Sequence, residues 1–129
     1  MFHSTVVDHL VFRVPNLNRT ERFYNVLLGE PFKANGYLMY MVGDTRLFFT
    51  PSVEHAPPFN KDHTGLNHLA LGIRSLEELE TIESQLNEQG VAHSAIKLWQ
   101  DGVTKYIWLD DPDGMRVEYW LRLPAEPSL

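Results

Sequence analysis

The 129-residue chain contains no cysteine, which excludes disulfide bonds, thiolate metal sites and a cysteine nucleophile. It also lacks an excess of basic residues, since 11 Lys and Arg stand against 17 Asp and Glu and the formal net charge is −6. We therefore expect no nucleic-acid partner and no anionic membrane partner. No apolar run approaches the length of a membrane span, and the first residues lack the features of a signal peptide. These absences favour a cytoplasmic enzyme or a cytoplasmic small-molecule binding protein.

The composition that remains is that of a folded domain. Hydrophobic residues make up 43% of the chain and charged residues 22%, which is typical of globular proteins and not of disordered ones. A chain of this length can bury one substantial core but not two ordinary ones. We therefore expect residues 1–129 to form a single domain.

The first part of the chain predicts a strand, a helix and three short strands. Residues 6–14 alternate as a strand, and Pro15 ends it. Residues 16–28 carry a helical apolar stripe formed by Leu17, Phe23, Val26 and Leu27, with an N-cap asparagine and Gly29 at the C-terminal end. The turn sequences Asn35-Gly36 and Gly43-Asp44 then separate three strand candidates, residues 32–34, 37–42 and 46–50.

The second part predicts the same order of elements. A proline-rich linker, residues 51–65, precedes an alternating strand at residues 66–73. Residues 75–89 predict a helix that opens with a capping box at Ser75 and Glu78. The residues expected to be buried on this helix are Leu76, Leu79, Ile82 and Leu86. Three strand candidates follow at residues 92–98, 103–110 and 115–121.

The two parts also resemble each other residue by residue, which indicates an internal repeat. "VDHLVF" in the first part matches "LNHLAL" in the second, and "TRLFF" matches "MRVEY". The repeat makes His9 equivalent to His68, and Phe48 equivalent to Glu118. We expect an α+β fold of two tandem βαβββ modules, at about residues 6–50 and 66–121, whose curled mixed sheet surrounds a metal cavity.

Three polar side chains lie in these strands at positions related by the repeat. His9, His68 and Glu118 alternate with apolar sets suited to packing under a helix, so each faces the side of its strand that no helix covers. One strand histidine is more often structural than metal-bound, but two at equivalent positions beside a carboxylate predict a shared metal site. A buried carboxylate also needs a compensating cation. Two histidines and one carboxylate suit Fe(II), which we favour, while zinc accepts the same ligands and Mn or Ni is also possible.

The segments "DHLVF", "NHLAL" and "DDPDGMRVEYW", within the double βαβββ pattern of residues 6–121, resemble the vicinal oxygen chelate superfamily. This group includes glyoxalase I, extradiol dioxygenases, fosfomycin-resistance transferases and bleomycin-resistance proteins. The resemblance implies that His9, His68 and Glu118 bind a divalent metal ion. It also implies that neighbouring oxygens of a small substrate occupy the remaining positions of the ion. Finally, it implies a homodimer, in which modules can be exchanged between chains.

Departures from the family patterns leave the reaction open. Phe48 replaces the fourth ligand of glyoxalase I-like enzymes, and Trp108 stands where extradiol dioxygenases have a tyrosine. Val11 replaces a threonine of the fosfomycin-resistance enzymes, while bleomycin-resistance proteins normally lack the metal ligands. The resemblance favours a dioxygenase-like enzyme. The alternatives are a metal-dependent lyase, isomerase or thiol transferase, and a metal-free small-molecule binding protein of the resistance type.

Further residues are candidates because they lie on or near the same faces. Tyr106 and His93 are the nearest candidates for acid–base catalysis. An aromatic wall with an arginine suits a planar or anionic substrate, and the predicted substrate-binding residues are Phe48, Trp108, Trp120, Arg116 and Tyr40. Three other histidines are expected to be ordinary surface residues, namely His3, His55 and His63.

Overall fold

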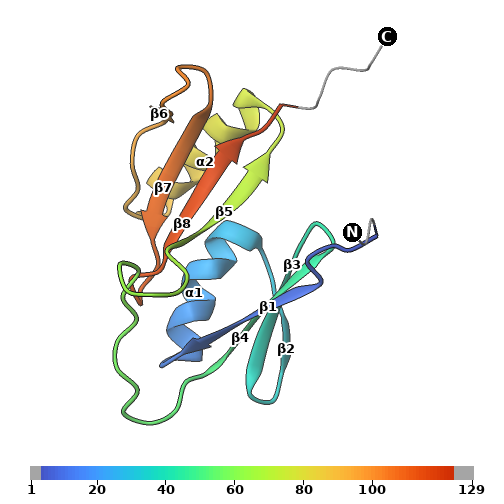
Figure 1. The fold of residues 1–129 in the computed structure, drawn as a ribbon, viewed down its shortest axis with the longest axis vertical. Coiled ribbons are helices and arrows are strands. Elements are labelled where there is room, and N and C mark those ends of the chain that lie inside the picture. The colour runs from blue at the N-terminus through green and yellow to red at the C-terminus, as the bar shows by residue number, and fades with distance from the viewer. Residues whose placement is uncertain (1–3, 124–129) are drawn as a thin grey trace. The chain divides into compact units, whose positions relative to one another are not determined.

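Each half of the chain folds as a strand, a helix and three further strands (Figure 1). This computed structural model describes residues 4–123, so His3 lies outside the described residues. The chain divides into two units, Met1–Pro58 and Phe59–Leu129, and each is described by itself. The division falls within residues 51–65, the stretch in which the sequence predicts a linker.

The first unit is a four-stranded mixed sheet with one helix. Its elements are β1 (His9–Val14), α1 (Leu17–Leu28), β2 (Phe32–Ala34), β3 (Tyr37–Val42) and β4 (Thr45–Pro51). The strand order is β1-β4-β3-β2, in which only β1 and β4 run parallel. A parallel pair needs a crossover connection, and α1 lies in that connection.

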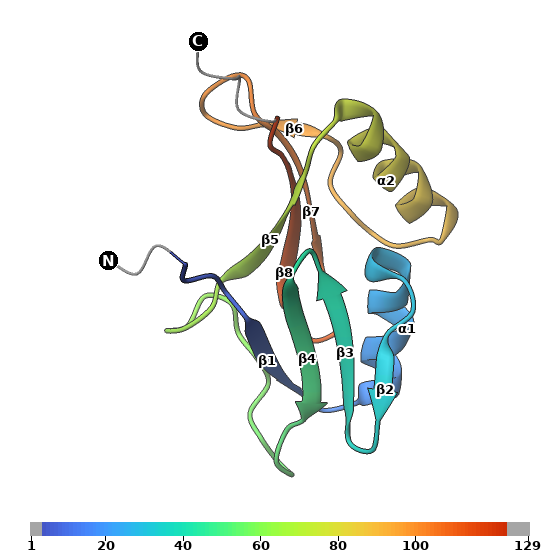
Figure 2. The same cartoon turned by 90° about the vertical axis from the view of Figure 1, so that its right-hand side faces the viewer.

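The second unit repeats this arrangement. Its elements are β5 (His68–Ile73), α2 (Leu76–Glu88), β6 (Lys97–Leu98), β7 (Lys105–Asp110) and β8 (Arg116–Leu121). The strand order is β5-β8-β7-β6, with β5 and β8 parallel. Figure 2 shows the helix of each unit on one side of its own sheet. The predicted α+β fold of two βαβββ modules is therefore confirmed.

Both helices begin at the caps that the sequence predicts. The side chain of Asn16 accepts a hydrogen bond from the backbone N–H of Arg19 at 3.0 Å. The Ser75 hydroxyl accepts one from the N–H of Glu78 at 3.1 Å. Each bond satisfies a helix N–H that has no partner inside the helix. At the other end of α1, Gly29 adopts a φ of 80°, which side-chain-bearing residues rarely adopt.

The core of the first unit is an aromatic cluster between α1 and the sheet. Tyr24 of α1 packs against Phe49 of β4 at 4.5 Å between ring centroids. Tyr40 of β3 is 1% exposed and donates its hydroxyl to Asn25 Oδ1 at 2.7 Å. The predicted placement of Tyr40 on a substrate-binding face is therefore wrong, because β3 directs Leu38 and Tyr40 toward the helix. Along α1, the fully buried residues are Thr20 and Tyr24, while the predicted stripe is half-buried.

The core of the second unit is aliphatic. Leu79 and Leu86 of α2 lie below 2% exposure, as do Ile107, Leu109 and Val117 of the sheet. The prediction that Leu76 is buried is wrong, since it is 37% exposed. Leu79 and Leu86 are seven residues apart and point in nearly the same direction on the helix. Leu76 is three residues before Leu79 and points roughly 60° away from it. Leu76 therefore lies at the edge of the buried stripe.

The strand predicted at residues 92–98 is also corrected, because only Lys97–Leu98 forms β6. The reason lies at Ser94. Its backbone N–H donates to the Trp108 carbonyl at 2.8 Å, but its side-chain hydroxyl accepts the Trp108 N–H at 3.0 Å. A side-chain oxygen thus takes the place of the backbone carbonyl, and the regular ladder stops there.

The strand register confirms the internal repeat. In the first unit His9 pairs with Arg46 and Val11 with Phe48. In the second unit His68 pairs with Arg116 and Ala70 with Glu118. Phe48 and Glu118 therefore occupy the same position in their sheets, as the matched segments "TRLFF" and "MRVEY" predict.

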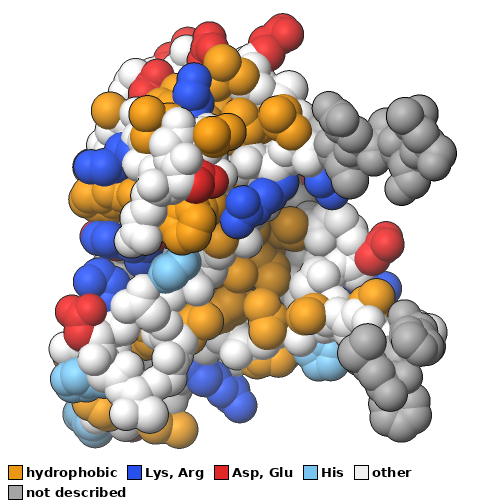
Figure 3. All heavy atoms as spheres, turned by 45° about the horizontal axis from the view of Figure 1, so that its top comes forward, with side chains coloured by type: hydrophobic (Ala, Val, Ile, Leu, Met, Phe, Trp, Pro, Cys, Tyr) orange, Lys and Arg blue, Asp and Glu red, His pale blue; other side chains and the backbone are white. Residues whose placement is uncertain are grey.

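Each unit also keeps large apolar side chains at its surface, and Figure 3 shows such side chains in orange on one face. Val7 and Val11 are exposed in the first unit, and Leu66, Trp99 and Val103 in the second. Among the residues that the structure describes, no helix is long and apolar enough to cross a membrane.

The core position of Tyr40 yields a stability prediction. We expect Tyr40→Phe to lower the free energy of unfolding by about 1 kcal/mol, because the hydrogen bond to Asn25 is lost. Burial raises the pKa of Tyr40, so the advantage of the unmodified protein should be complete below the ordinary tyrosine pKa of about 10 and shrink above it. Urea denaturation at several pH values measures both effects.

Tyr37→Phe is the matched control, because Tyr37 lies on the opposite face of β3 and is only half-buried. It should change stability by less than Tyr40→Phe. Equal stability of Tyr40→Phe and the unmodified protein would contradict the core position.

Candidate metal and substrate site

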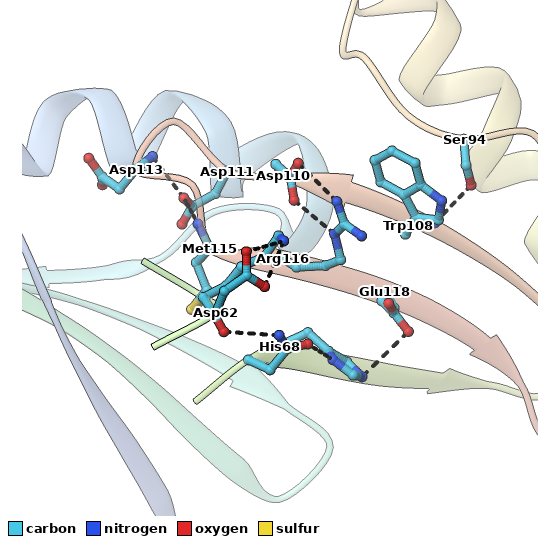
Figure 4. Close-up of polar contacts among 12 residues, drawn as sticks. Asp62, His68, Ser94, Trp108, Asp110, Asp111, Asp113, Met115, Arg116 and Glu118 are labelled. Carbon is cyan, nitrogen blue, oxygen red and sulfur yellow. Dashed lines mark hydrogen bonds and ion pairs between the residues drawn. The ribbon is translucent and has the colours of Figure 1, made fainter. Parts of the chain in front are cut away.

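The candidate site of the second unit lies on the sheet face that α2 does not cover. Leu71 of β5 and Val117 and Tyr119 of β8 are buried under α2. The residues that alternate with them along each strand therefore point to the other face. Figure 4 shows His68 of β5 and Glu118 of β8 pointing toward each other from adjacent strands. Their Nε2 and Oε1 atoms are 3.6 Å apart. The Glu118 side chain is 10% exposed and that of His68 39%, so the pair joins a buried carboxylate to an accessible imidazole.

The His68 ring is held by the residue before it. Asn67 Oδ1 lies 2.7 Å from His68 Nδ1, and the Asn67 amide nitrogen donates to the Lys61 carbonyl at 2.9 Å. The second bond fixes which end of the amide faces His68. Because the amide oxygen can only accept, Nδ1 carries a proton, and in the neutral ring the lone pair is on Nε2. His68 therefore presents to Glu118 the nitrogen that can bind a metal ion.

Glu118 is held by an indole. Trp120 donates its Nε1–H to Glu118 Oε1 at 2.6 Å. Tyr106 stacks on Trp120, with ring centroids 4.8 Å apart and an interplanar angle of 14°, and Trp99 meets its edge at 5.8 Å. A neutral donor satisfies part of the hydrogen-bonding capacity of the carboxylate without cancelling its charge.

The nearest arginine has another partner. Arg116 donates to Asp110 through Nε at 2.9 Å and through a terminal nitrogen at 3.2 Å, and its guanidinium lies 4.1 Å from the Trp108 ring centroid. The hydrogen bonds to Asp110 raise the pKa of Arg116 further above its ordinary value. Its predicted role in binding a substrate anion stays a prediction, and such an anion would compete with Asp110.

The turn before β8 is held by the side chain of Asp111. Asp111 Oδ1 accepts from the backbone N–H groups of Asp113 and Met115 at 2.8 and 3.0 Å. Gly114 adopts a φ of 85° in this turn. The first aspartate of "DPDG" thus stabilises the turn between β7 and β8, as turn chemistry predicts.

The first unit shows the same imidazole arrangement. Asp8 Oδ2 lies 2.7 Å from His9 Nδ1, so a proton on Nδ1 is favoured and, in the neutral ring, the lone pair is on Nε2. The hydrogen bond with His9 holds the pKa of Asp8 below its usual value. Phe48, the counterpart of Glu118, meets the His9 ring edge-on with centroids 5.7 Å apart. The first unit thus has the histidine of the site but an aromatic ring in place of the carboxylate.

The predicted residues divide into three groups. The strand register places on one face of the second sheet His68, Arg116, Glu118, Trp120, Trp108 and Tyr106. His9 and Phe48 belong to the first unit, and no group of three or more His, Asp or Glu residues within residues 4–123 is arranged to hold a metal ion. His93 lies elsewhere, with its ring nitrogens 2.5 Å from the Ser94 carbonyl and 2.6 Å from Asn87 Oδ1. His55 and His63 are exposed, as expected.

Comparison with known proteins assigns the chain to a family. The family model of the Glyoxalase/Bleomycin resistance protein/Dioxygenase superfamily matches residues 6–119, which span both modules. The chain belongs to this superfamily. The resemblance inferred from the repeated histidine segments and the C-terminal strand is therefore confirmed. Among proteins with curated descriptions, none matches the sequence.

Several solved structures share the fold of this chain. A glyoxalase family protein from Enterococcus faecalis is 26% identical, with coverage of 93% of this chain and 99% of that one and a TM-score of 0.73. Lactoylglutathione lyase from Agrobacterium tumefaciens is 15% identical, with coverage of 94% and 96% and a TM-score of 0.70. An oxidase, ChaP-H1, is 21% identical, with coverage of 92% and 97% and a TM-score of 0.70. The last two likenesses show the fold alone.

Sequence reasoning missed the residues that orient the site of this glyoxalase-superfamily chain. Asp8 and Asn67 directly precede the two histidines, and both supply an oxygen to Nδ1. The repeated pairs "DH" and "NH" carried this signal. The hydrogen bond from Trp120 to Glu118 joins two residues on one strand. Alternation predicts that their side chains share a face, but it does not predict the hydrogen bond between them.

The contact with Asn67 yields a prediction for the His68 tautomer. In the metal-free protein we expect neutral His68 to carry its proton on Nδ1, and Asn67→Ala to give a substantial fraction of the Nε2–H form. Two-bond ¹⁵N–¹H couplings in NMR spectra measure the tautomer. His9 serves as the internal control, because Asp8 holds it and the substitution does not touch it. An Nε2–H form of His68 in the unmodified protein would show that Asn67 does not orient the ring.

Proposed function

We propose that the chain is a metal-dependent enzyme of the dioxygenase-like kind, which binds a small substrate through adjacent oxygens at a site of two histidines and one glutamate. The observation that carries the proposal is the approach of His68 Nε2 to the buried carboxylate of Glu118 at 3.6 Å. His9 is proposed as the third ligand on the basis of the repeat and of its matching oxygen contact at Nδ1. The expected homodimer and cytoplasmic location are part of this proposal.

The donor set of the second unit fits a divalent ion. Two atoms bound at about 2.1 Å to one ion and at right angles lie about 3 Å apart, so the separation of His68 and Glu118 is compatible with shared binding. Asn67 holds His68 through the far ring nitrogen, Nδ1, whereas Trp120 donates to Glu118 Oε1, the same oxygen that approaches His68. Such outer partners orient the ligands of metal sites and fix the histidine tautomer. A bound divalent ion would supply Lewis-acid polarisation of adjacent substrate oxygens.

The chemistry of the ligands favours Fe(II), because two imidazoles and one carboxylate form the facial set of non-haem iron oxygenases. Zinc, Mn and Ni remain alternatives. Phe48 occupies the position equivalent to Glu118 and has no donor atom, so a fourth protein ligand at that position is not expected. The remaining positions would then be available to substrate.

Among the predicted acid–base residues, Tyr106 is the better supported. Its cross-strand partner is Trp120, so it shares a sheet face with Glu118 and would hold or move a proton at its hydroxyl. Both nitrogens of His93 already have oxygen partners, and one partner, Asn87, belongs to α2. We therefore assign His93 a structural contact at the end of that helix.

Metal analysis tests the proposal. We expect protein purified without chelators to hold close to one divalent ion per site. Glu118→Gln and Glu118→Ala should weaken this binding by more than the roughly 10- to 100-fold loss that removal of an outer-shell partner causes. Elemental analysis and zinc competition measure it. Glu80→Gln, at an exposed position of α2, is the matched control and should bind metal normally.

Assays on the metal-loaded protein then separate the reaction classes. Oxygen uptake with Fe(II) and a panel of catechols is expected of a dioxygenase-like enzyme. Glutathione-dependent turnover with Mn, Ni or Zn would instead favour a lyase, isomerase or thiol transferase. An unmodified protein that binds none of these ions would contradict the proposal and favour a metal-free binding protein.

A further inference from the structure

Arg122 directly follows β8 and contacts the ring that holds Glu118. Its guanidinium carbon lies 5.1 Å from the centroid of the Trp120 ring. The same indole donates its N–H to Glu118 Oε1 at 2.6 Å. The indole therefore meets a cation with its ring and a buried carboxylate with its N–H.

The backbone of Arg122 is anchored, although the residue is exposed. Its N–H donates to the Ile73 carbonyl of β5 at 2.8 Å. Its carbonyl accepts a longer hydrogen bond, at 3.5 Å, from the guanidinium of Arg74. These contacts keep the base of the Arg122 side chain beside Trp120.

Aromatic neighbours hold the indole itself. Tyr106 stacks on Trp120 at 4.8 Å between ring centroids, with an interplanar angle of 14°. Trp99 meets the indole edge-on at 5.8 Å. Because the indole packs against two other rings, the direction of its N–H is fixed and the donor stays on Glu118.

A cation over an aromatic ring attracts the electron density of that ring. An indole that loses electron density becomes a stronger N–H donor, and linked polar groups polarise one another in this way. Glu118 needs a strong donor, because the nearest arginine, Arg116, makes its hydrogen bonds to Asp110. Arg122 can therefore stabilise the carboxylate through the indole.

One acid competes for the charge of Arg122. Hydrogen bonds from Thr104 and Val103 are the main causes that lower the pKa of Asp101, and the charge of Arg122 contributes least. Asp101 therefore depends more on its own turn than on Arg122.

We propose that Arg122 is a positioning residue of the candidate metal site, which acts on Glu118 through the Trp120 indole. Its charge strengthens the hydrogen bond from Trp120 and so holds Glu118 Oε1 toward His68 Nε2, which lies 3.6 Å away. This inference deepens the proposed function and rests on it for the role of Glu118 as a metal ligand. The effect on the hydrogen bond itself does not require a metal ion.

The direction of the change in metal affinity distinguishes this role from simple charge repulsion. A positive charge near a cation site repels the cation, so its removal would by itself strengthen zinc binding. For Arg122→Gln we expect the opposite, a loss of about two- to fivefold in zinc affinity, which is the size of an exposed cation–aromatic contact. Arg122→Lys keeps the charge and should recover most of the affinity. Zinc competition measures these affinities.

A double-mutant cycle tests whether the effect passes through the indole. Trp120→Phe removes the N–H, so the addition of Arg122→Gln to this variant should not lower zinc affinity further. Lys97→Gln is the matched control, because Lys97 is exposed and pairs with Tyr106 on the same sheet face, two strands away from β8. It should not weaken zinc binding. Circular dichroism confirms that each variant is folded.

The metal-free protein reports on the hydrogen bond directly. The indole N–H resonance of Trp120 is assigned by its loss in Trp120→Phe. We expect Arg122→Gln to move this resonance upfield and to speed exchange of the proton with solvent, because the hydrogen bond is weaker. Arg122→Lys should have a smaller effect, and Lys97→Gln should have none.

Three results would overturn the inference. The first is equal or stronger zinc binding in Arg122→Gln, and the second is an unchanged indole N–H resonance in that variant. The third is an equal loss of zinc affinity from Arg122→Gln with and without the Trp120 indole. A protein that binds no zinc contradicts the proposed function, and the N–H resonance then decides this inference by itself.

Discussion

The parallel pairing of the first and last strands in each unit is the constraint on which the candidate site depends. In the second unit this pairing sets His68 beside Arg116 and Ala70 beside Glu118. A shift by one residue would turn Glu118 toward α2 and bury a carboxylate among leucines, at a cost of several kcal/mol. The alternation of Val117 and Tyr119 into the core therefore fixes the register and, with it, the approach of Glu118 to His68.

The residues around His68 and Glu118 determine how the buried carboxylate of Glu118 is stabilised. Glu118 is a carboxylate at 8% exposure, and the nearest guanidinium is engaged with Asp110. The indole N–H of Trp120 supplies a hydrogen bond and Arg116 supplies a longer-range attraction, but a direct counter-charge would come only from a protonated His68 or a bound cation. Since Asn67 occupies Nδ1, both possibilities act through the same atom, His68 Nε2. The carboxylate is thus arranged to bind a positive partner on its exposed side.

The sequence predicts the modules, the helix caps and the equivalence of Phe48 with Glu118, because each depends on local patterns or on the repeat. It fails where tertiary contacts decide. Tyr40 follows an alternating strand whose two faces are both apolar, so periodicity does not reveal that it faces α1 and bonds Asn25. The strand expected at residues 92–98 ends early because the Ser94 hydroxyl takes over a backbone hydrogen bond. The contacts that orient His9, His68 and Glu118 are single hydrogen bonds, and no periodicity predicts them.

The repeat also shows how one scaffold acquires a polar site on only one of its two sheets. Both units hold a histidine whose Nδ1 is bound by the preceding residue, so that arrangement belongs to the scaffold. The units differ at the paired position on the last strand. Phe48 gives His9 an apolar edge contact, whereas Glu118 gives His68 a charged oxygen and recruits the Trp120 N–H. The two units therefore differ by one side chain at a position that faces a histidine. A phenyl ring there gives a packing contact, whereas a carboxylate there gives a candidate metal ligand.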